Sequence, residues 1–403
     1  SYNALPINAE TAFFLDRFKS YLRDHTATAD GVQRDTRREI WMETQSIVEA
    51  LLLPEYHSYD HLAHEVWLNG PDDEFPRRIP NGVFPKDLAR IKVLMSVYYF
   101  FEQVRNKSLD DPRKMPLEQT KHAAPPTTDI NRELTNVDER QKVFLRELLA
   151  LGNGKIPDRV HMLTWNYDIQ LLMAYANQIG ENSLVRCMQS DRLNVHPGRV
   201  PRFAHDEPSL VHVNGVAGLI NNLDTGEIRL MNYGKEVGTL NLADLIAQNQ
   251  SLKWMLLLME NVWSIHETFS FAWEDFWSTR LTHKYMARFG QITRDLVVVG
   301  YSFPDDNART DLKFFKTYVG FGALEPKRIF LVSPSPNADQ LKKRLDSLRG
   351  RLNFPPDCTY TVAIYLVPLG DRIPLPNELD MLATTYVPEI WEHTVPDPFS
   401  AHP

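Results

Sequence analysis

Hydrophobic residues recur at helical spacing through most of the first 150 residues. Four stripes carry the pattern, with apolar positions three or four residues apart, at residues 14–22, 41–52, 88–101 and 144–149. This spacing places the apolar side chains on one face of an amphipathic helix. Polar stretches that contain prolines interrupt the stripes, and we expect loops there. The N-terminal part of the chain is therefore predicted to be mainly helical.

The pattern changes from about residue 156, where short apolar runs alternate with helical patterns. The runs predict strands at residues 160–163, 210–213, 296–299 and 329–332. Helical patterns separate most of them, at residues 168–180, 241–289, 305–319 and 337–350. A last strand is expected at residues 360–367, before a segment rich in proline. Alternation of this kind is typical of a parallel sheet with helices on both faces.

The predicted fold class is α/β, with a Rossmann-like parallel sheet covered on both faces and an additional helical module. The chain of 403 residues is long enough for two modules of ordinary size. We place the helical module at residues 1–150, the Rossmann-like domain at residues 151–370 and a proline-rich tail at residues 371–403.

Composition and charge narrow the possible functions. The chain has 44 basic and 52 acidic residues, a net charge of −8, so nucleic acid is not expected as its main ligand. Its two cysteines, Cys187 and Cys358, cannot form a four-cysteine zinc site, and we expect no metal. No apolar run reaches the roughly 18–20 residues that cross a bilayer, and no signal segment opens the chain. We expect a cytoplasmic protein without membrane contact.

Polar clusters follow the four predicted strands. They are Thr164-Trp-Asn166-Tyr-Asp168, His212-Val-Asn214-Gly215, Gly300-Tyr-Ser302 and Ser333-Pro-Ser335. The carboxyl ends of parallel strands meet at one edge of a sheet, where ligands bind in the crevice beside free backbone amides and helix N-termini. Each cluster taken alone also fits a helix cap, because Ser, Thr, Asp and Asn favour that position. The four together predict a binding crevice.

Three of these clusters resemble motifs of the sirtuin-like family. Thr164-Trp-Asn166-Tyr-Asp168 is similar to the family's Thr-x-Asn-x-Asp motif, and Gly300-Tyr-Ser302 is similar to its Gly-x-Ser motif. Ser333 falls where sirtuins often carry an Asn that meets the adenosine ribose. The resemblance covers about residues 156–335 and points most closely to prokaryotic sirtuin-like NADases of antiphage defence. Deacylation, the family's other activity, is disfavoured because its zinc module of paired cysteines has no counterpart here.

The resemblance implies NAD as substrate or ligand and assigns roles to the strand-end residues. The implied catalytic residues are Asn166, His212 and Asp168. The implied NAD-binding residues are Thr164, Asn214, Gly215, Gly300, Ser302 and Ser333. Cleavage of the nicotinamide–ribose bond develops positive charge on the sugar. An uncharged amide such as Asn166 can orient the ribose or a water, and the Asp168 carboxylate can stabilise the cation.

The sequence departs from the family pattern in two respects. The family's catalytic His directly precedes a Gly, whereas here Asn214 precedes Gly215 and His212 lies two residues earlier. Strand periodicity separates His212 and Asn214 by roughly 6–7 Å on one face. Either His212 acts from a shifted register, or the site is degenerate. The family's Gly-Ala-Gly-x-Ser loop is also unmatched, and the opening residues 1–6 resemble the segment that follows it, so we expect that loop and its strand to precede Ser1.

Three functional hypotheses follow from these patterns. The first is an NAD-hydrolysing effector of a prokaryotic antiphage defence complex, forming homo-oligomers and working with an ATPase or sensor subunit. The second is a catalytically degenerate subunit that binds a partner, or senses NAD or ADP-ribose, and supports oligomerisation. An unrelated nucleotide-binding Rossmann enzyme is the third, and it is weaker because no Gly-rich fingerprint follows any predicted strand.

Overall fold

The computed structural model of the chain describes sixteen segments. They are residues 9–23, 31–53, 59–69, 86–104, 137–181, 183–197, 207–222, 227–230, 269–271, 274, 277–301, 308–320, 327–333, 338–351, 360–368 and 373–393.

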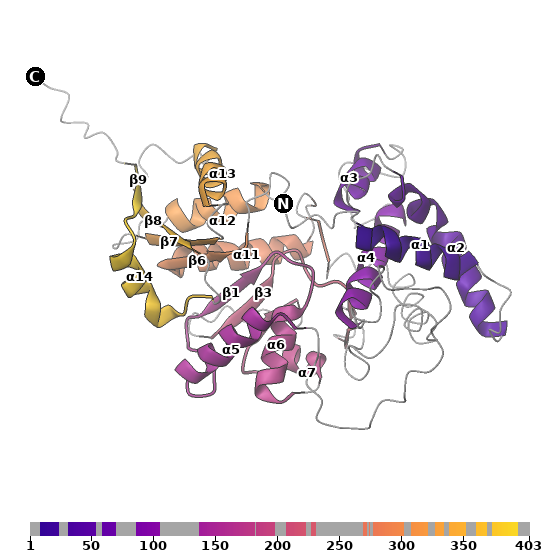
Figure 1. Ribbon diagram of the computed structural model, residues 1–403, viewed down its shortest axis with the longest axis horizontal. Helices are drawn as coiled ribbons and strands as arrows, with labels where there is room; N and C mark the ends of the chain where they lie inside the picture. The colour runs from indigo at the N-terminus through magenta and orange to yellow at the C-terminus, as the bar shows by residue number, and fades with distance from the viewer. Residues whose placement is uncertain are drawn as a thin grey trace, which may run out of the picture.

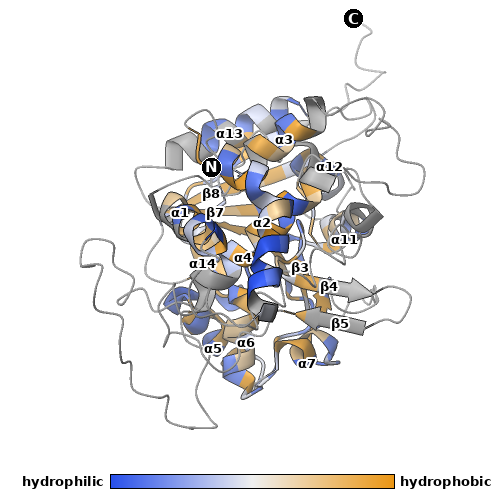
Figure 2. Cartoon of the chain, turned by 90° about the vertical axis from the view of Figure 1, so that its right-hand side faces the viewer, coloured by the Kyte–Doolittle hydropathy of each residue, from blue (hydrophilic) through white to orange (hydrophobic). Residues whose placement is uncertain are grey.

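Among the described residues, four helices form the N-terminal module, as the apolar stripes predict. They are α1 (Ala9–Arg23), α2 (Gly31–Leu51), α3 (Tyr59–Asn69) and α4 (Lys86–Val104). Figure 1 shows them grouped at one side of the molecule. Every residue from 91 to 98 of α4 is buried, so this helix is central to the module. In Figure 2, α2 carries long hydrophilic stretches.

The first sheet is parallel and lies between two layers of helices. It joins β1 (His161–Thr164), β3 (Ser209–His212) and β2 (Asn194–His196), in the order β1-β3-β2. Met162 and Leu210 face the core that includes α5 (Glu139–Leu151), α6 (Gln170–Ile179) and α7 (Leu184–Gln189). Their neighbours Leu163 and Val211 point the other way, toward Tyr285 and Phe289 of α11 (Trp277–Ile292). The alternation of strand side chains therefore gives both faces a hydrophobic cover.

The second sheet contains, in the described part of the chain, four strands in the order β6-β7-β8-β9. They are β6 (Asp295–Val299), β7 (Lys327–Ser333), β8 (Tyr360–Pro368) and β9 (Glu389–His393). The first three are parallel, and β9 runs antiparallel to β8. One face packs against α12 (Ala308–Gly320) and α13 (Ala338–Gly350), and the other against α14 (Leu379–Thr385). The strands β7 and β8 are mostly hydrophobic in Figure 2, as expected for a sheet covered on both faces.

The fold is thus mixed α/β with parallel strands, as the sequence pattern predicts, but its arrangement differs from the prediction in three respects. The described parallel strands belong to two hydrogen-bonded sheets, and β1 and β6 are not paired with each other. A separate antiparallel pair, β4 (Leu219–Asn222) and β5 (Glu227–Leu230), follows the first sheet. The segment expected as a tail contains the 3₁₀ turn η3 (Pro376–Glu378), α14 and β9.

Two further observations bear on the predicted organisation. The helix α5, assigned by sequence to the N-terminal module, lies beside α6 and beneath β1 (Figure 1). The helical pattern at residues 241–289 falls largely outside the described residues, and its described helix is α11. Among the described helices, none combines the length and apolar character needed to cross a membrane.

Candidate functional site

The carboxyl ends of β1 and β3 lie side by side. Thr164, the last residue of β1, pairs with His212, the last residue of β3. The ladder continues one step further, because the Val213 N–H donates to the Thr164 carbonyl at 2.7 Å. The Thr164-Trp-Asn166 and His212-Val-Asn214 clusters are therefore brought together, as the sequence predicts from strand order alone.

Asn214 and Thr164 fix the backbone that carries Asn166. The Asn214 side-chain amide donates to the Trp165 carbonyl at 3.1 Å, and Asn214 itself is only 3% exposed. The Thr164 hydroxyl accepts a hydrogen bond from the Asn166 N–H at 3.2 Å. Asn166 is exposed. The arrangement places the exposed amide of Asn166 at the rim of a buried polar wall, which is formed by the side chains of His212 and Asn214.

His212 is the titratable side chain of this wall, and it is almost fully buried. It is 1% exposed, and neither ring nitrogen makes a hydrogen bond of ordinary geometry to a described residue. Burial lowers its pKa to about 4, while the Asn166 backbone raises it and His196 lowers it by smaller amounts. The imidazole is therefore neutral at pH 7, with one nitrogen able to donate and the other able to accept a proton.

Asp168 is held at the start of α6. Its Oδ1 accepts a hydrogen bond from the Gln170 N–H at 2.9 Å. Burial raises the pKa of this carboxyl, and hydrogen bonds from the Gln170 backbone and the Asn166 side chain oppose that rise. The contact ties Asp168 to the first residue of α6, but the N-cap position of that helix is Ile169, which makes no side-chain cap, so the capping role that the sequence leaves open for Asp168 is not the one observed. The carboxylate nevertheless remains next to Asn166.

A third strand end reaches the same place through an aromatic stack. The rings of Trp165, after β1, and Tyr301, after β6, lie 4.6 Å apart between centroids at an interplanar angle of 29°. Gly300 between β6 and Tyr301 has φ of +64°, which other residues adopt only with strain. The stack joins the two sheets at their carboxyl ends, although no ladder hydrogen bond links β1 to β6.

Behind this stack lies Asp311, a buried carboxyl group that none of the strand-end motifs indicates. Asp311 is 1% exposed, and the Tyr301 hydroxyl donates to its carboxyl group, 2.8 Å from Oδ2 and 2.9 Å from Oδ1. Burial raises the pKa of Asp311 to about 8, and contacts with Tyr301 and Trp165 oppose the rise. The Trp165 indole N–H nevertheless makes no hydrogen bond of ordinary geometry to any described residue.

One sequence signal could have identified Asp311. It stands on the apolar stripe of α12, three, four and seven residues before Phe314, Phe315 and Tyr318. A carboxylate on the buried face of a helix is uncommon unless it has a partner, so its position alone marks a structured polar site.

Replacing Asp311 with Asn should make the protein less sensitive to alkali. The carboxyl has a pKa of about 8 in the folded chain against an ordinary value of 3.8, so the folded state retains the proton that the unfolded state loses. Wild-type stability should therefore fall as pH rises from about 4 to 8. The relative advantage of Asp311→Asn should grow by roughly 1.4 kcal/mol per pH unit in that window.

Urea denaturation of both proteins at pH 5, 7 and 9 measures this difference. Asp16→Asn, which neutralises an exposed carboxylate on α1, is the matched control and should leave the pH dependence almost unchanged. Parallel stability curves for Asp311→Asn and wild type would contradict the assignment of a raised pKa to Asp311.

Of the remaining predicted site residues, the structure describes Gly215 and Ser333 but not Ser302. Gly215 has φ of +83° and forms an isolated antiparallel bridge with Phe269. Ser333 is the last residue of β7, one strand beyond β6, where its backbone pairs with Pro368. It therefore lies at the same sheet edge as Gly300. Ser302 lies outside the described residues.

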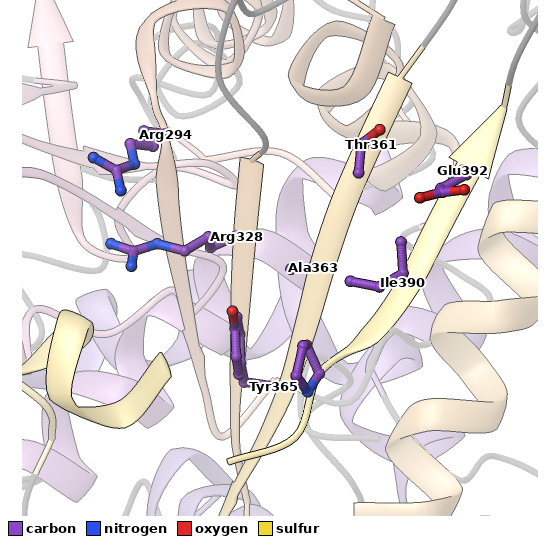
Figure 3. Close-up of a pocket in the computed structure, with 8 residues that line it drawn as sticks. Arg294, Arg328, Thr361, Ala363, Tyr365, Ile390 and Glu392 are labelled. Atoms are coloured by element: carbon purple, nitrogen blue, oxygen red, sulfur yellow. The ribbon is translucent and has the colours of Figure 1, made fainter. Parts of the chain in front are cut away.

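A separate hollow of about 520 Å³ opens over the second sheet (Figure 3). Arg294 and Arg328 line it near the amino ends of β6 and β7, and Glu392 lies at its opposite side. The Arg328 guanidinium is occupied by Asp295 at 2.8 Å and Asp380 at 2.7 Å. The hollow is at the wrong end of the strands for the predicted site, and nearby carboxylates offset its arginines.

The described part of the chain contains no group of three or more His, Cys, Asp or Glu side chains placed to hold a metal ion. The strand-end residues instead combine an exposed amide, a buried neutral imidazole, a carboxylate and two aromatic rings. Such a set can hydrogen-bond sugar hydroxyls and contact an aromatic base. Comparison of the sequence with models of known protein families and with curated protein sequences gives no match.

Proposed function

We propose that the chain binds NAD at the carboxyl ends of β1, β3 and β6 and hydrolyses its nicotinamide–ribose bond. The observation that carries the proposal is the meeting of Asn166, His212 and the Trp165–Tyr301 stack at one sheet edge. Open α/β sheets bind nucleotides at this edge. The mixed α/β fold with parallel strands is compatible with the Rossmann-like domain that the motif resemblance implies.

The proposed reaction consumes NAD and water and yields nicotinamide, ADP-ribose and a proton. Breaking the C1′–N bond leaves positive charge on the ribose, and nicotinamide departs with the bonding electrons. Asn166 orients the ribose hydroxyls or the attacking water. The neutral imidazole of His212 accepts the proton released when water adds to C1′. Asp168 stabilises the sugar cation from beside Asn166.

The cellular role follows from the motif resemblance. We place the chain in a cytoplasmic antiphage defence complex, as a homo-oligomer that works with an ATPase or sensor subunit. Hydrolysis of NAD in such a complex would deplete the infected cell of its dinucleotide. The strand-end motifs Thr164-Trp-Asn166-Tyr-Asp168 and Gly300-Tyr-Ser302 are what support this assignment.

A specific observation favours one alternative. Asn214 occupies the position before Gly215, its amide is engaged by the Trp165 carbonyl, and His212 is only 1% exposed. A chain with these features can retain NAD or ADP-ribose without cleaving it. In that case it would be a sensor or assembly subunit of the same kind of complex.

Nicotinamide release from NAD should separate these functions. We expect the wild-type chain to release nicotinamide, and we expect Asn166→Ala to slow release by about 100-fold, because the sugar loses its orienting amide. Gln178→Ala, which removes an exposed amide from α6, is the matched control and should retain full activity. Release is followed by chromatography, and binding of ADP-ribose by calorimetry.

The two readouts lead to distinct conclusions. Binding of ADP-ribose without nicotinamide release, in the chain with its partner subunits, would establish the sensor alternative. If Asn166→Ala keeps both ADP-ribose binding and nicotinamide release, the strand ends are not the active site.

A further inference from the structure

A buried ion pair connects the helical module to the segment beside the candidate site. Lys92 of α4 and Glu274 are each fully buried, and their Nζ and Oε2 atoms are 2.7 Å apart. The Lys92 ammonium also donates to the Phe269 carbonyl at 2.9 Å. Glu274 Oε2 accepts in turn from the Phe271 N–H at 2.8 Å. The two side chains therefore hydrogen-bond to the backbone of Phe269 and Phe271 as well as neutralising each other's charge.

Residues 269–271 also contact the polar wall of the site directly. Phe269 forms an antiparallel bridge with Gly215, and the Ser270 N–H donates to the Asn214 carbonyl at 2.9 Å. Asn214 then donates through its side chain to the Trp165 carbonyl. Three hydrogen bonds, linked through the Phe269–Ser270 peptide and through Asn214, thus connect Lys92 to Trp165, the residue that precedes Asn166.

Aromatic packing follows the same route. The Tyr167 ring meets Phe269 edge-on at 4.5 Å and lies 6.3 Å from Phe271. Tyr99 of α4 approaches Tyr167 from the helical module at 6.1 Å. The Tyr167 carbonyl also accepts from the Ala217 N–H at 2.9 Å. The rings hold the segments on either side of Asn166 and Asn214 against α4.

A buried ion pair is a poor device for stability alone, since well-packed apolar residues of similar volume often perform as well or better. Its polarity matters here because each member meets a particular backbone group. An ammonium can donate to the Phe269 carbonyl but a carboxylate cannot, and a carboxylate can accept from the Phe271 N–H but an ammonium cannot. The pair therefore specifies the register of residues 269–271.

We propose that Lys92 and Glu274 are positioning residues that hold residues 269–271 against Asn214 and Gly215, and so set the wall beneath Asn166. The helical module is then a required part of the site. The consequence for ligand binding rests on the proposed function, whereas the consequence for backbone order does not.

The test uses the full chain with Lys92→Met and Glu274→Leu combined, a pair that removes both charges together. Hydrogen–deuterium exchange of peptides spanning residues 214–217 and 269–271 should accelerate by about tenfold or more. The affinity for ADP-ribose should fall by about tenfold or more, because the wall is no longer held in place. The reversed pair, Lys92→Glu with Glu274→Lys, should restore neither property.

Lys327→Met is the matched control. Lys327 is also a buried lysine that donates to backbone carbonyls, those of Gly290 at 2.7 Å and Thr293 at 2.9 Å, and these lie in and after α11. Its loss should leave exchange at residues 269–271 and ADP-ribose affinity unchanged.

Wild-type exchange at residues 269–271 in the double variant, or rescue by the reversed pair, would overturn the proposal. If wild-type protein binds no ADP-ribose, the proposed function fails, and the exchange rates alone still decide the positioning role.

Discussion

Lys92→Met alone is expected to lower the free energy of unfolding by roughly 3–5 kcal/mol, because it leaves a buried carboxylate without its cation. Glu274 is 2% exposed and its Oε2 lies 2.7 Å from the Lys92 ammonium. Burial already raises the pKa of Glu274, and the ammonium is the largest opposing influence. Without it the carboxyl must take up a proton or draw in water, and the Phe269 carbonyl loses its donor.

The double variant Lys92→Met with Glu274→Leu should recover most of this loss, to within about 1–2 kcal/mol of wild type. Urea denaturation of wild type, both single variants and the double variant at pH 7 gives the coupling free energy between the two positions. Additive single losses, or a loss below about 1 kcal/mol in Lys92→Met, would show that the pair is not the buried unit described here.

The second large effect is expected at His212. His212→Leu should reduce NAD hydrolysis by about 100-fold or more, since no group remains to accept the proton of the attacking water. Stability at pH 7 should stay within about 1 kcal/mol of wild type or rise, because a buried imidazole that makes no hydrogen bond of ordinary geometry to a described residue is replaced by an apolar side chain. Activity and stability would then change independently.

The same substitution should reduce acid sensitivity. The His212 pKa is lowered from 6.5 to about 4 in the folded chain, so the unfolded state binds the proton first as pH falls. The stability that depends on neutral His212 is complete above pH 6.5 and is lost between pH 6.5 and about 4. At pH 5, His212→Leu should therefore gain roughly 2 kcal/mol relative to wild type.

Denaturation curves at pH 5 and 7, together with nicotinamide release, measure both effects. His64→Gln, on the exposed part of α3, is the control and should change neither. Residual pH dependence is expected in His212→Leu, because burial also lowers the pKa of His196 to about 4. Full hydrolysis by His212→Leu would exclude this imidazole as the base.

The sequence was a good guide to the parallel strands. Short apolar runs place β1, β3, β6 and β7 within a few residues of their observed bounds, because strands buried on both faces read as continuous hydrophobic segments. It was a poor guide to the edges. The strand β2 has only three residues, and β9 has only two apolar residues, Ile390 and Trp391, between polar ones and after a segment rich in proline. Neither gives a strong local signal.

The candidate site was predicted to a similar extent. The meeting of Thr164 and His212 follows from strand order, since carboxyl ends of parallel strands share an edge. The Tyr301–Asp311 contact could not be derived in this way, because it depends on how α12 packs against the second sheet. The link from Lys92 to Phe269 is even less local, as it joins positions 177 residues apart. Burial of both charges is a property of the folded chain alone.

A crystal structure of the full chain with ADP-ribose tests most directly whether the strand ends bind the nucleotide. We expect density for the nucleotide at the carboxyl ends of β1 and β3, with ribose hydroxyls within hydrogen-bond distance of the Asn166 side chain and the His212 ring. Density instead in the hollow beside Arg294 and Arg328, or empty strand ends at saturating ADP-ribose, would contradict this expectation.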